Sequence, residues 1–226
     1  MGDLLSLIKE FHCLAAFWMT IKLTVVGAIG SLILGTIIAI FRVSPVPVLR
    51  GIGTGYVTLI RNTPLTLIAF ICSVALLGTL GLSLSGNDDV ITNGFRWGVI
   101  AIAVYHATFV AEALRSGVNT VPQGQAEAAR AIGLNFGQSL TSIILPQAFR
   151  GAIAPLGNTL IALTKNTTVL ATVGVAEMSY AMKEMIESRA SLLYLIFLLV
   201  AAAFVILTLP VGALFTSLSR RLAVRR

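Results

Sequence analysis

The 226-residue sequence contains few charged residues. Only 11% of its residues are charged, whereas a soluble globular domain carries about 25% because its surface faces water. With 57% hydrophobic residues and a mean hydropathy of +0.93, most of the surface must face lipid or other helices. At about 20 residues per span, the length admits up to about seven spans and leaves no room for a sizeable soluble catalytic domain. We therefore expect an all-α integral membrane protein.

Residues that hold metals, form disulfides or bind nucleotides are equally scarce. The two cysteines, Cys13 and Cys72, lie in apolar surroundings and have neither the spacing of a metal site nor that of a disulfide framework. With only two histidines, a metal cluster or a Ser/His/Asp set within the spans is disfavoured, and so is a membrane-embedded enzyme. The sequence also has no GxxxxGK[ST] loop, so this chain is not expected to hold ATP phosphates or any other cofactor.

Five apolar runs predict about five transmembrane helices within a single domain over residues 1–226. The predicted spans cover residues 18–41, 52–82, 97–114, 151–175 and 192–215, and the fourth is the most interrupted by polar residues. The net charge of +7 is a topology signal: nine of the 16 basic residues fall in the loop at 42–50, the stretch at 115–150 and the tail. Because basic loops stay in the cytoplasm, we expect a cytoplasmic C-terminus and an external N-terminus, and no nucleic-acid partner.

The stretch at 115–150 is polar enough to lie outside the membrane. Pro122 is well placed to start a short helix, and Gly133 suits the left-handed residue that ends it. Asn135 is a candidate cap for a second short helix, which Pro146 is expected to end. Composition alone favours a solvated amphipathic linker here.

The spacing within this stretch favours a more specific interpretation. Glu127-Ala128-Ala129 is followed after three residues by Gly133, and later by Leu145-Pro146. This pattern resembles the EAA signature of permease subunits of ABC importers. Residues 61–65, 111–118, 121–125, 145–150, 163–168 and 173–177 resemble, in order, the RGTPL, AExxRGGI, VPKGQ, LPQALR, LLKDTS and IGVxEL motifs of the polar amino-acid permeases, the HisM/HisQ-like family, with the glutamate/glutamine type as one possibility.

The resemblance implies a type I ABC importer permease fold in the bacterial plasma (inner) membrane, with a cytoplasmic EAA coupling helix. The implied partners are a dimer of ABC ATPase subunits, which bind ATP and Mg, a second permease subunit that is identical or related, an external substrate-binding protein and membrane lipid. The residues that it implies for ATPase coupling are Glu127, Ala128, Ala129, Gly133, Leu145 and Pro146.

Polar residues within the spans are candidates for the substrate path, because ionisable groups there usually face a cavity or a partner. They are Lys165, Asn166, Thr167, Thr168, Arg61, Thr63, His106 and Glu112. Four of them have a structural alternative. The polar groups around Lys165 could satisfy each other at a broken helix, and Arg61 could snorkel to lipid headgroups. His106 could serve helix packing, and Glu112 could pair with Arg115. Asn166 stands where the family motif has Asp, which favours glutamate or glutamine over a cationic substrate.

Glu177, Lys183, Glu184, Glu187 and Arg189 are expected to form a solvated external segment that could touch the binding protein. The alternative function is an ion-gradient-driven secondary transporter. That class requires acidic residues at membrane depth, and only Glu112 lies near a predicted span.

Overall fold

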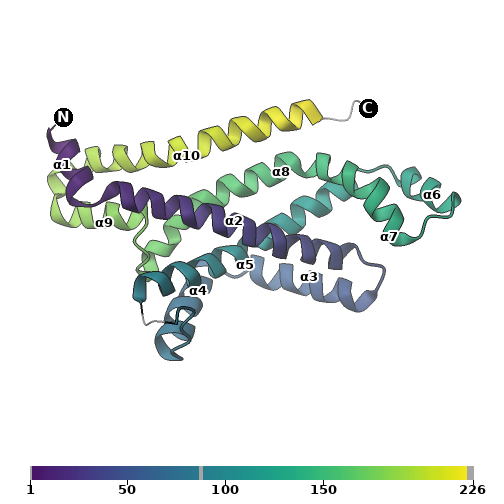
Figure 1. Cartoon of the computed structure of the whole chain (residues 1–226), viewed down its shortest axis with the longest axis horizontal. Coiled ribbons are helices and arrows are strands. Elements are labelled where there is room, and N and C mark those ends of the chain that lie inside the picture. Colours follow the sequence, from purple (N-terminus) through teal and green to yellow (C-terminus); the bar gives the residue numbers. More distant parts are fainter. Residues whose placement is uncertain (1, 87–88, 223–226) are drawn as a thin grey trace.

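The computed structural model describes residues 2–86 and 89–222, and every regular element within them is a helix (Figure 1). The α-helices are α1 (Gly2–Glu10), α2 (Cys13–Val43), α3 (Pro47–Arg61), α4 (Leu65–Phe70), α5 (Val90–Asn119), α6 (Gln123–Ala131), α7 (Phe136–Ser139), α8 (Leu145–Asn166), α9 (Met178–Ser188) and α10 (Leu193–Leu222). Two π-helical segments, η1 (Ile71–Thr79) and η2 (Leu140–Ile144), and two 3-10 segments, η3 (Thr167–Val173) and η4 (Ala190–Leu192), lie between them.

The helices supply up to five membrane spans. α2, α5 and the stretch Ala190–Leu222 are each long and apolar enough to cross a bilayer. Two bent pairs, Pro47–Arg61 with Leu65–Thr79 and Phe136–Val173 with Met178–Ser188, would each add one. The helices at the first, third and fifth expected spans extend beyond the expected bounds, to Cys13–Val43, Val90–Asn119 and Ala190–Leu222.

The run expected at residues 52–82 is not one straight helix. α3 ends at Arg61, and the chain bends by 96° before α4 begins at Leu65. Pro64 explains the break, since it disfavours helical backbone at Thr63 and has no N–H to continue the helix. Its carbonyl instead accepts the first hydrogen bonds of α4, from the N–H groups of Leu67 and Ile68.

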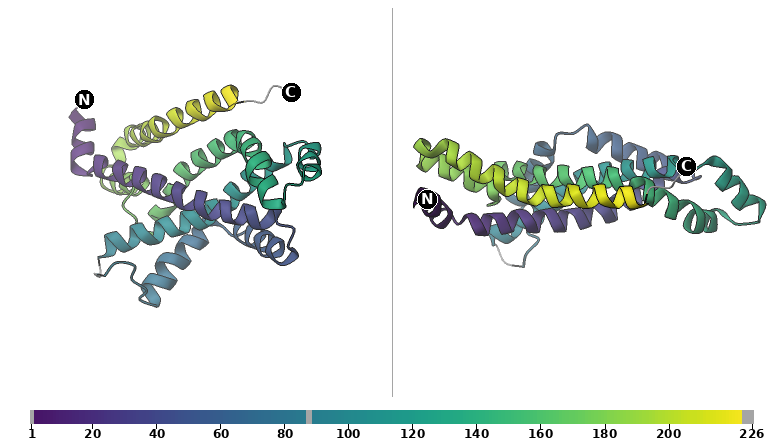
Figure 2. Two further views of the ribbon diagram at one scale, coloured as in Figure 1. Left: turned by 45° about the vertical axis from the view of Figure 1, so that its right-hand side comes forward. Right: turned by 90° about the horizontal axis from the view of Figure 1, so that it is seen from above.

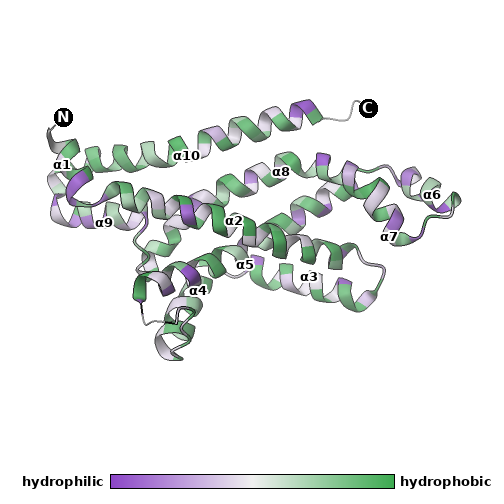
Figure 3. Ribbon diagram, in the orientation of Figure 1, coloured by the Kyte–Doolittle hydropathy of each residue, from purple (hydrophilic) through white to green (hydrophobic). Residues whose placement is uncertain are grey.

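The centre of the molecule is the packing of α2, α5 and α8, which lie side by side in all three views (Figures 1 and 2). Leu23 of α2, Ile102 of α5 and Leu163 of α8 are fully buried there, together with Leu170 of η3. α10 packs against α8 and α9 but leaves many of its apolar side chains exposed, among them Tyr194 and Leu209. Figure 3 shows that the ribbons of α2 and α10 are mostly in the hydrophobic colour, and the exposed apolar side chains of these helices suit contact with lipid.

The two ends of the bundle differ in composition. The α2–α3 turn, α6, α7 and the C-terminal end of α10 lie together at one end, which we call the α6 end; α1 and α9 lie at the opposite end (Figure 1). The α6 end also includes the end of α2, the start of α3, the end of α5 and the start of α8. Its basic residues are Arg42, Arg50, Arg115, Arg130, Arg150, Arg220 and Arg221. The basic residues that were separated along the sequence are thus gathered at one end of the fold.

The corner between α6 and α7 is built as the sequence predicts. Gly133 has a φ of 84°, and the N–H groups of Gly133 and Leu134 donate to the carbonyls of Arg130 and Ala129. This is the Schellman arrangement that ends helices at a left-handed glycine. Asn135 caps α7 through a reciprocal pair of hydrogen bonds with Gln138.

The expected end of the second short helix at Pro146 is wrong. The chain stays helical from Phe136 to Val173, passing through η2 into α8 with Pro146 in the first turn of α8. The wider π turn accommodates the proline, because the N–H of Leu145 bonds to the carbonyl of Leu140, five residues back. α5 also continues to Asn119, so the segment between α5 and α8 is shorter than the expected 115–150 loop.

Candidate functional site

The polar groups of α5 and α8 meet in the middle of the bundle. His106 lies in α5 with only 1% of its surface exposed, and Asn166 is the last residue of α8. Asn166 Nδ2 lies 3.1 Å from His106 Nε2, within hydrogen-bond distance. Asn166, which stands where the family motif has Asp, is therefore in direct contact with His106, the histidine predicted for the substrate path.

This pair leaves one nitrogen without a partner. His106 Nδ1 is buried and makes no hydrogen bond within the described residues. If the Asn166 amide donates to Nε2, the neutral ring carries its proton on Nδ1. If the amide is turned so that Oδ1 accepts from Nε2, then Nδ1 is an unused acceptor. In both arrangements the ring retains one polar atom for a water or a bound molecule.

A second polar group surrounds the carboxylate of Glu112. Arg42 at the end of α2 donates to Glu112 Oε1 at 2.7 Å, while Arg115 and Arg61 approach the same carboxylate at 3.8 and 4.0 Å. Three guanidinium groups therefore face one carboxylate, which leaves an excess of positive charge. The expected pairing of Glu112 with Arg115 is present, and the shorter pair with Arg42 adds to it.

Phe109 connects the two groups. Its ring centroid lies 5.7 Å from that of His106 and 5.8 Å from the guanidinium carbon of Arg61. Arg61 is thus placed over an aromatic face, where a cation is attracted by the π electrons. A continuous series of side chains from α8, α5 and α3 runs from Asn166 through His106 and Phe109 to Arg61.

The other predicted path residues occupy different positions. Lys165 is exposed on the surface of α8, on the same side as the exposed Asn158. Thr167 is fully buried and donates to the carbonyl of Thr164, and Thr63 donates to the carbonyl of Leu59. Thr168 is half-buried. The hydroxyls of Thr63 and Thr167 are therefore bonded to carbonyls of the helix that precedes each, α3 and α8 respectively.

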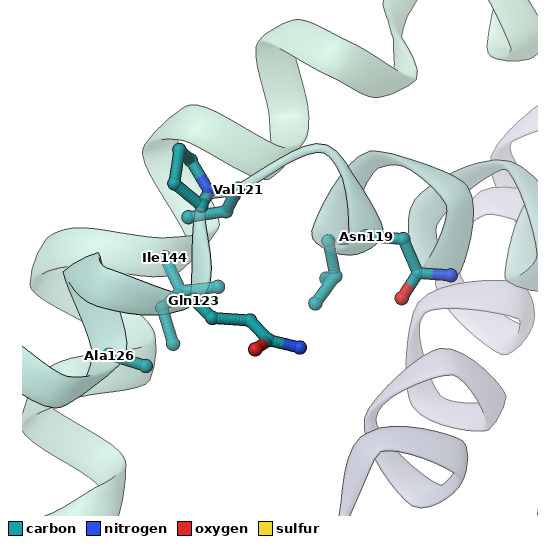
Figure 4. Close-up of a pocket in the computed structure, with 7 residues that line it drawn as sticks. Asn119, Val121, Gln123, Ala126 and Ile144 are labelled. Atoms are coloured by element: carbon teal, nitrogen blue, oxygen red, sulfur yellow. The ribbon is translucent and has the colours of Figure 1, made fainter.

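The EAA residues are divided between the surface and the interior of the α6–α7 corner. Glu127 and Ala128 are exposed, while Ala129 is 3% exposed and faces the rest of the chain. A cleft lies beside this helix, between the end of α5 and α6, and the amide of Gln123 points into it (Figure 4). Leu145 and Pro146 lie in the first turn of α8 and are exposed.

Packing contacts and continuous helix lead from α6 to the pair formed by Asn166 and His106. α6 packs against α7 and η2, and η2 continues directly into α8. α8 in turn ends at Asn166, which contacts His106.

One expectation for the external segment is wrong. Lys183, Glu184 and Glu187 are exposed on α9, but Glu177 is completely buried. Its carboxylate accepts the N–H groups of Ser179 at 2.7 Å and Tyr180 at 3.0 Å, which caps α9. The hydroxyl of Thr20 in α2 lies 3.4 Å from the same carboxylate. A buried carboxylate needs such partners, and the sequence pattern around Glu177 did not reveal them.

Comparison with known proteins places these features in a family. The sequence matches the binding-protein-dependent transport system inner membrane components over residues 31–224. The glutamate transport system permease protein GluC of Corynebacterium glutamicum is 54% identical over 216 residues, covering 94% of this chain and 95% of that protein. The probable glutamine ABC transporter permease protein GlnM of Bacillus subtilis is 35% identical over 206 residues, covering 91% of both.

Solved structures resemble the fold. A crystal structure of an amino acid ABC transporter with histidines matches with a TM-score of 0.82 at 27% identity, covering 97% of this chain and 98% of that one. An inward-facing MetNI methionine ABC transporter matches with a TM-score of 0.77 at 18% identity, covering 96% and 98%, and supports the fold alone.

Proposed function

Because the chain belongs to the binding-protein-dependent transport system inner membrane components, we propose that it moves glutamate, or a closely similar amino acid, across the membrane by alternating access. Its helical architecture is the type I ABC importer permease fold, and its relatives are permeases of amino-acid ABC transporters. The observation that carries the choice of substrate is the 54% identity, over 94% of the chain, to a glutamate permease.

The charge of the predicted path supports an acidic substrate. Lys165 is an exposed cation in α8, within the apolar stretch that follows Gly151. A charged side chain is costly against lipid, so Lys165 faces a water-filled cavity or a second subunit. Arg61 and its neighbours add positive charge near Glu112, and Asn166 contributes no negative charge. These groups favour a ligand that carries two carboxylates.

A second permease subunit, identical or related, would complete this path. The side of α8 that carries Asn158 and Lys165 is exposed in the single chain, although its neighbours are apolar. Two such faces placed together would enclose a polar channel, whereas one alone would meet lipid. The exposed face of α8 therefore supports a pair of permeases with the path between them.

The exposed face of α6 supports ATP coupling by a partner. Glu127 and Ala128 offer a small, accessible surface. Ala129, on the other face of α6, is packed against the rest of the chain. A dimer of ATPase subunits, which holds ATP and Mg, would seat this helix and push it when the nucleotide binds. The helical connection from η2 through α8 would carry that push to Asn166 and His106.

The distribution of basic residues supports the membrane orientation. The α6 end gathers seven arginines from six elements, and basic segments stay in the cytoplasm. We place the α6 end and the C-terminus on the cytoplasmic side of the bacterial plasma membrane. α1 and α9 then face outward, toward a substrate-binding protein.

Competition of uptake tests the substrate assignment. The complex is reconstituted in proteoliposomes with the binding protein, and uptake of labelled glutamate is measured against unlabelled glutamate, glutamine and arginine. Glutamate should compete most strongly and arginine weakly. Strong competition by arginine with none by glutamate would overturn the assignment.

A charge-removal variant tests the path itself. Lys165→Met removes one charge-assisted contact, which contributes about 1.5–3 kcal/mol, so half-saturation by glutamate should rise roughly 10- to 100-fold. Arg50→Met removes a positive charge from an exposed position at the start of α3, away from the predicted path, and serves as the control. Equal transport by the two variants would remove Lys165 from the path.

A further inference from the structure

A groove outside the transport path lies near the α6 end of the bundle. Its volume is about 590 Å³, and its walls come from α2, α5, the segment from η2 to α8, and the last described residue of α10. Leu32, Ile40, Leu114 and Phe149 represent its mainly aliphatic and aromatic lining. The groove thus offers hydrocarbon surface between helices that cross the membrane.

Water is a poor occupant of such a groove. The α2 wall runs from Leu32 to Val43, in the second half of a helix that is long and apolar enough to cross a bilayer. Filling an apolar wall with hydrocarbon rather than water is favoured in proportion to the apolar area that is covered. A flexible acyl chain can follow the irregular lining formed by four helical segments.

Two guanidinium groups also line the groove. Arg150 is exposed in α8 and forms no ion pair within residues 2–86 and 89–222. Arg115 contacts Glu112 at 3.8 Å, but that carboxylate is already held by Arg42 at 2.7 Å. The groove therefore combines an apolar wall with positive charge that this chain does not neutralise.

We propose that this groove binds an anionic phospholipid, with one acyl chain against the apolar wall and the headgroup phosphate on Arg115 and Arg150. Guanidinium groups bind phosphate oxygens with two parallel hydrogen bonds, and basic pockets between spanning helices at the cytoplasmic side bind anionic headgroups. A helix from another protein would fill the groove but would leave both guanidiniums to be neutralised. The site rests on the membrane orientation proposed above, but it does not depend on which substrate is transported.

Native mass spectrometry of the complete transporter tests this site. The permease, purified with its ATPase, is exposed to equal amounts of phosphatidylglycerol and phosphatidylcholine in detergent, and bound lipids are counted. Phosphatidylglycerol should be retained preferentially. Arg150→Gln should reduce that preference about fivefold, the ratio that corresponds to one arginine at an anionic membrane surface. Arg50→Gln removes the same charge at the start of α3, outside the groove, and should change nothing.

A second pair of variants tests the hydrocarbon part. Thr36 is half-buried and lines the groove, so Thr36→Trp should fill it and release the retained lipid, whereas Thr36→Val keeps its shape and should retain it. Size-exclusion chromatography verifies that each variant remains assembled. The proposal is overturned if phosphatidylcholine is held as tightly, if Arg50→Gln and Arg150→Gln have the same effect, or if Thr36→Trp keeps its phosphatidylglycerol.

Discussion

The closest helix contact near the α6 end predicts a large effect of one added methyl group. A Cβ on Gly117 of α5 would overlap the backbone carbonyl oxygen of Ala148 and lie 3.0 Å from the Cβ of Ala152, both in α8. Since neither a backbone carbonyl nor an alanine methyl can rotate away, α5 and α8 must separate by roughly 1 Å, and overpacking of this kind costs about 1–3 kcal/mol. Gly117→Ala should therefore lower the thermal midpoint in detergent by roughly 4–8 °C, taking about 2 kcal/mol for the cost.

A second glycine supplies the control for this prediction. A Cβ on Gly55 of α3 would meet nothing within 4 Å, so Gly55→Ala changes helix propensity without a clash. This variant should be neutral or slightly stabilising, by up to about 1 kcal/mol. The separation of α5 from α8 should also weaken coupling between ATP hydrolysis and uptake. Equal thermal midpoints for the two variants would refute the close contact between α5 and α8.

Three further substitutions test separate parts of the account. Glu127→Lys reverses a charge on the exposed face of α6, and we expect ATP hydrolysis to continue with little uptake; an unchanged ratio of amino acid moved to ATP hydrolysed would exclude α6 from coupling. Asn166→Asp adds a carboxylate beside His106 and should raise competition by arginine relative to glutamate roughly tenfold, about 1.4 kcal/mol, in the uptake assay; no change in this ratio would separate Asn166 from selectivity. Glu177→Ala leaves the N–H groups of Ser179 and Tyr180 without their partner and should cost about 1–3 kcal/mol in thermal unfolding, while Glu184→Ala on the exposed side of α9 should stay within about 0.5 kcal/mol. An equal loss of unfolding free energy in the two variants would mean that Glu177 does not cap α9 as a buried carboxylate.

The helical class and the α6–α7 corner could be predicted from the sequence because their signals are local. Gly133 adopts the left-handed conformation and Asn135 caps the following helix, as their residue types suggest. The break at Thr63-Pro64 also has a local signal, the proline itself. Average hydropathy does not detect this break, so the apolar run at 52–82 predicts one span. The prediction that a helix ends at Pro146 is wrong because the π turn at η2 allows the helix to continue through the proline.

The candidate site was less predictable because it depends on contacts between distant segments. The sequence identifies His106 and Asn166 as polar residues in apolar runs, and the fold brings them within 3.1 Å. Phe109 carried no signal, since an aromatic residue in a spanning helix is unremarkable until its neighbours are known. Arg42 was assigned only to topology, although it forms the shortest pair with Glu112. Its partner lies 70 positions away, and no pattern in the chain links the two.

ATP dependence is the most direct measurement of the central claim. Proteoliposomes that contain this chain with its ATPase and binding protein are loaded with ATP, with ADP, or with an ion gradient and no nucleotide, and labelled glutamate uptake is measured. We predict uptake only with ATP and the binding protein. Uptake driven by the ion gradient without ATP would contradict the account and support a secondary transporter.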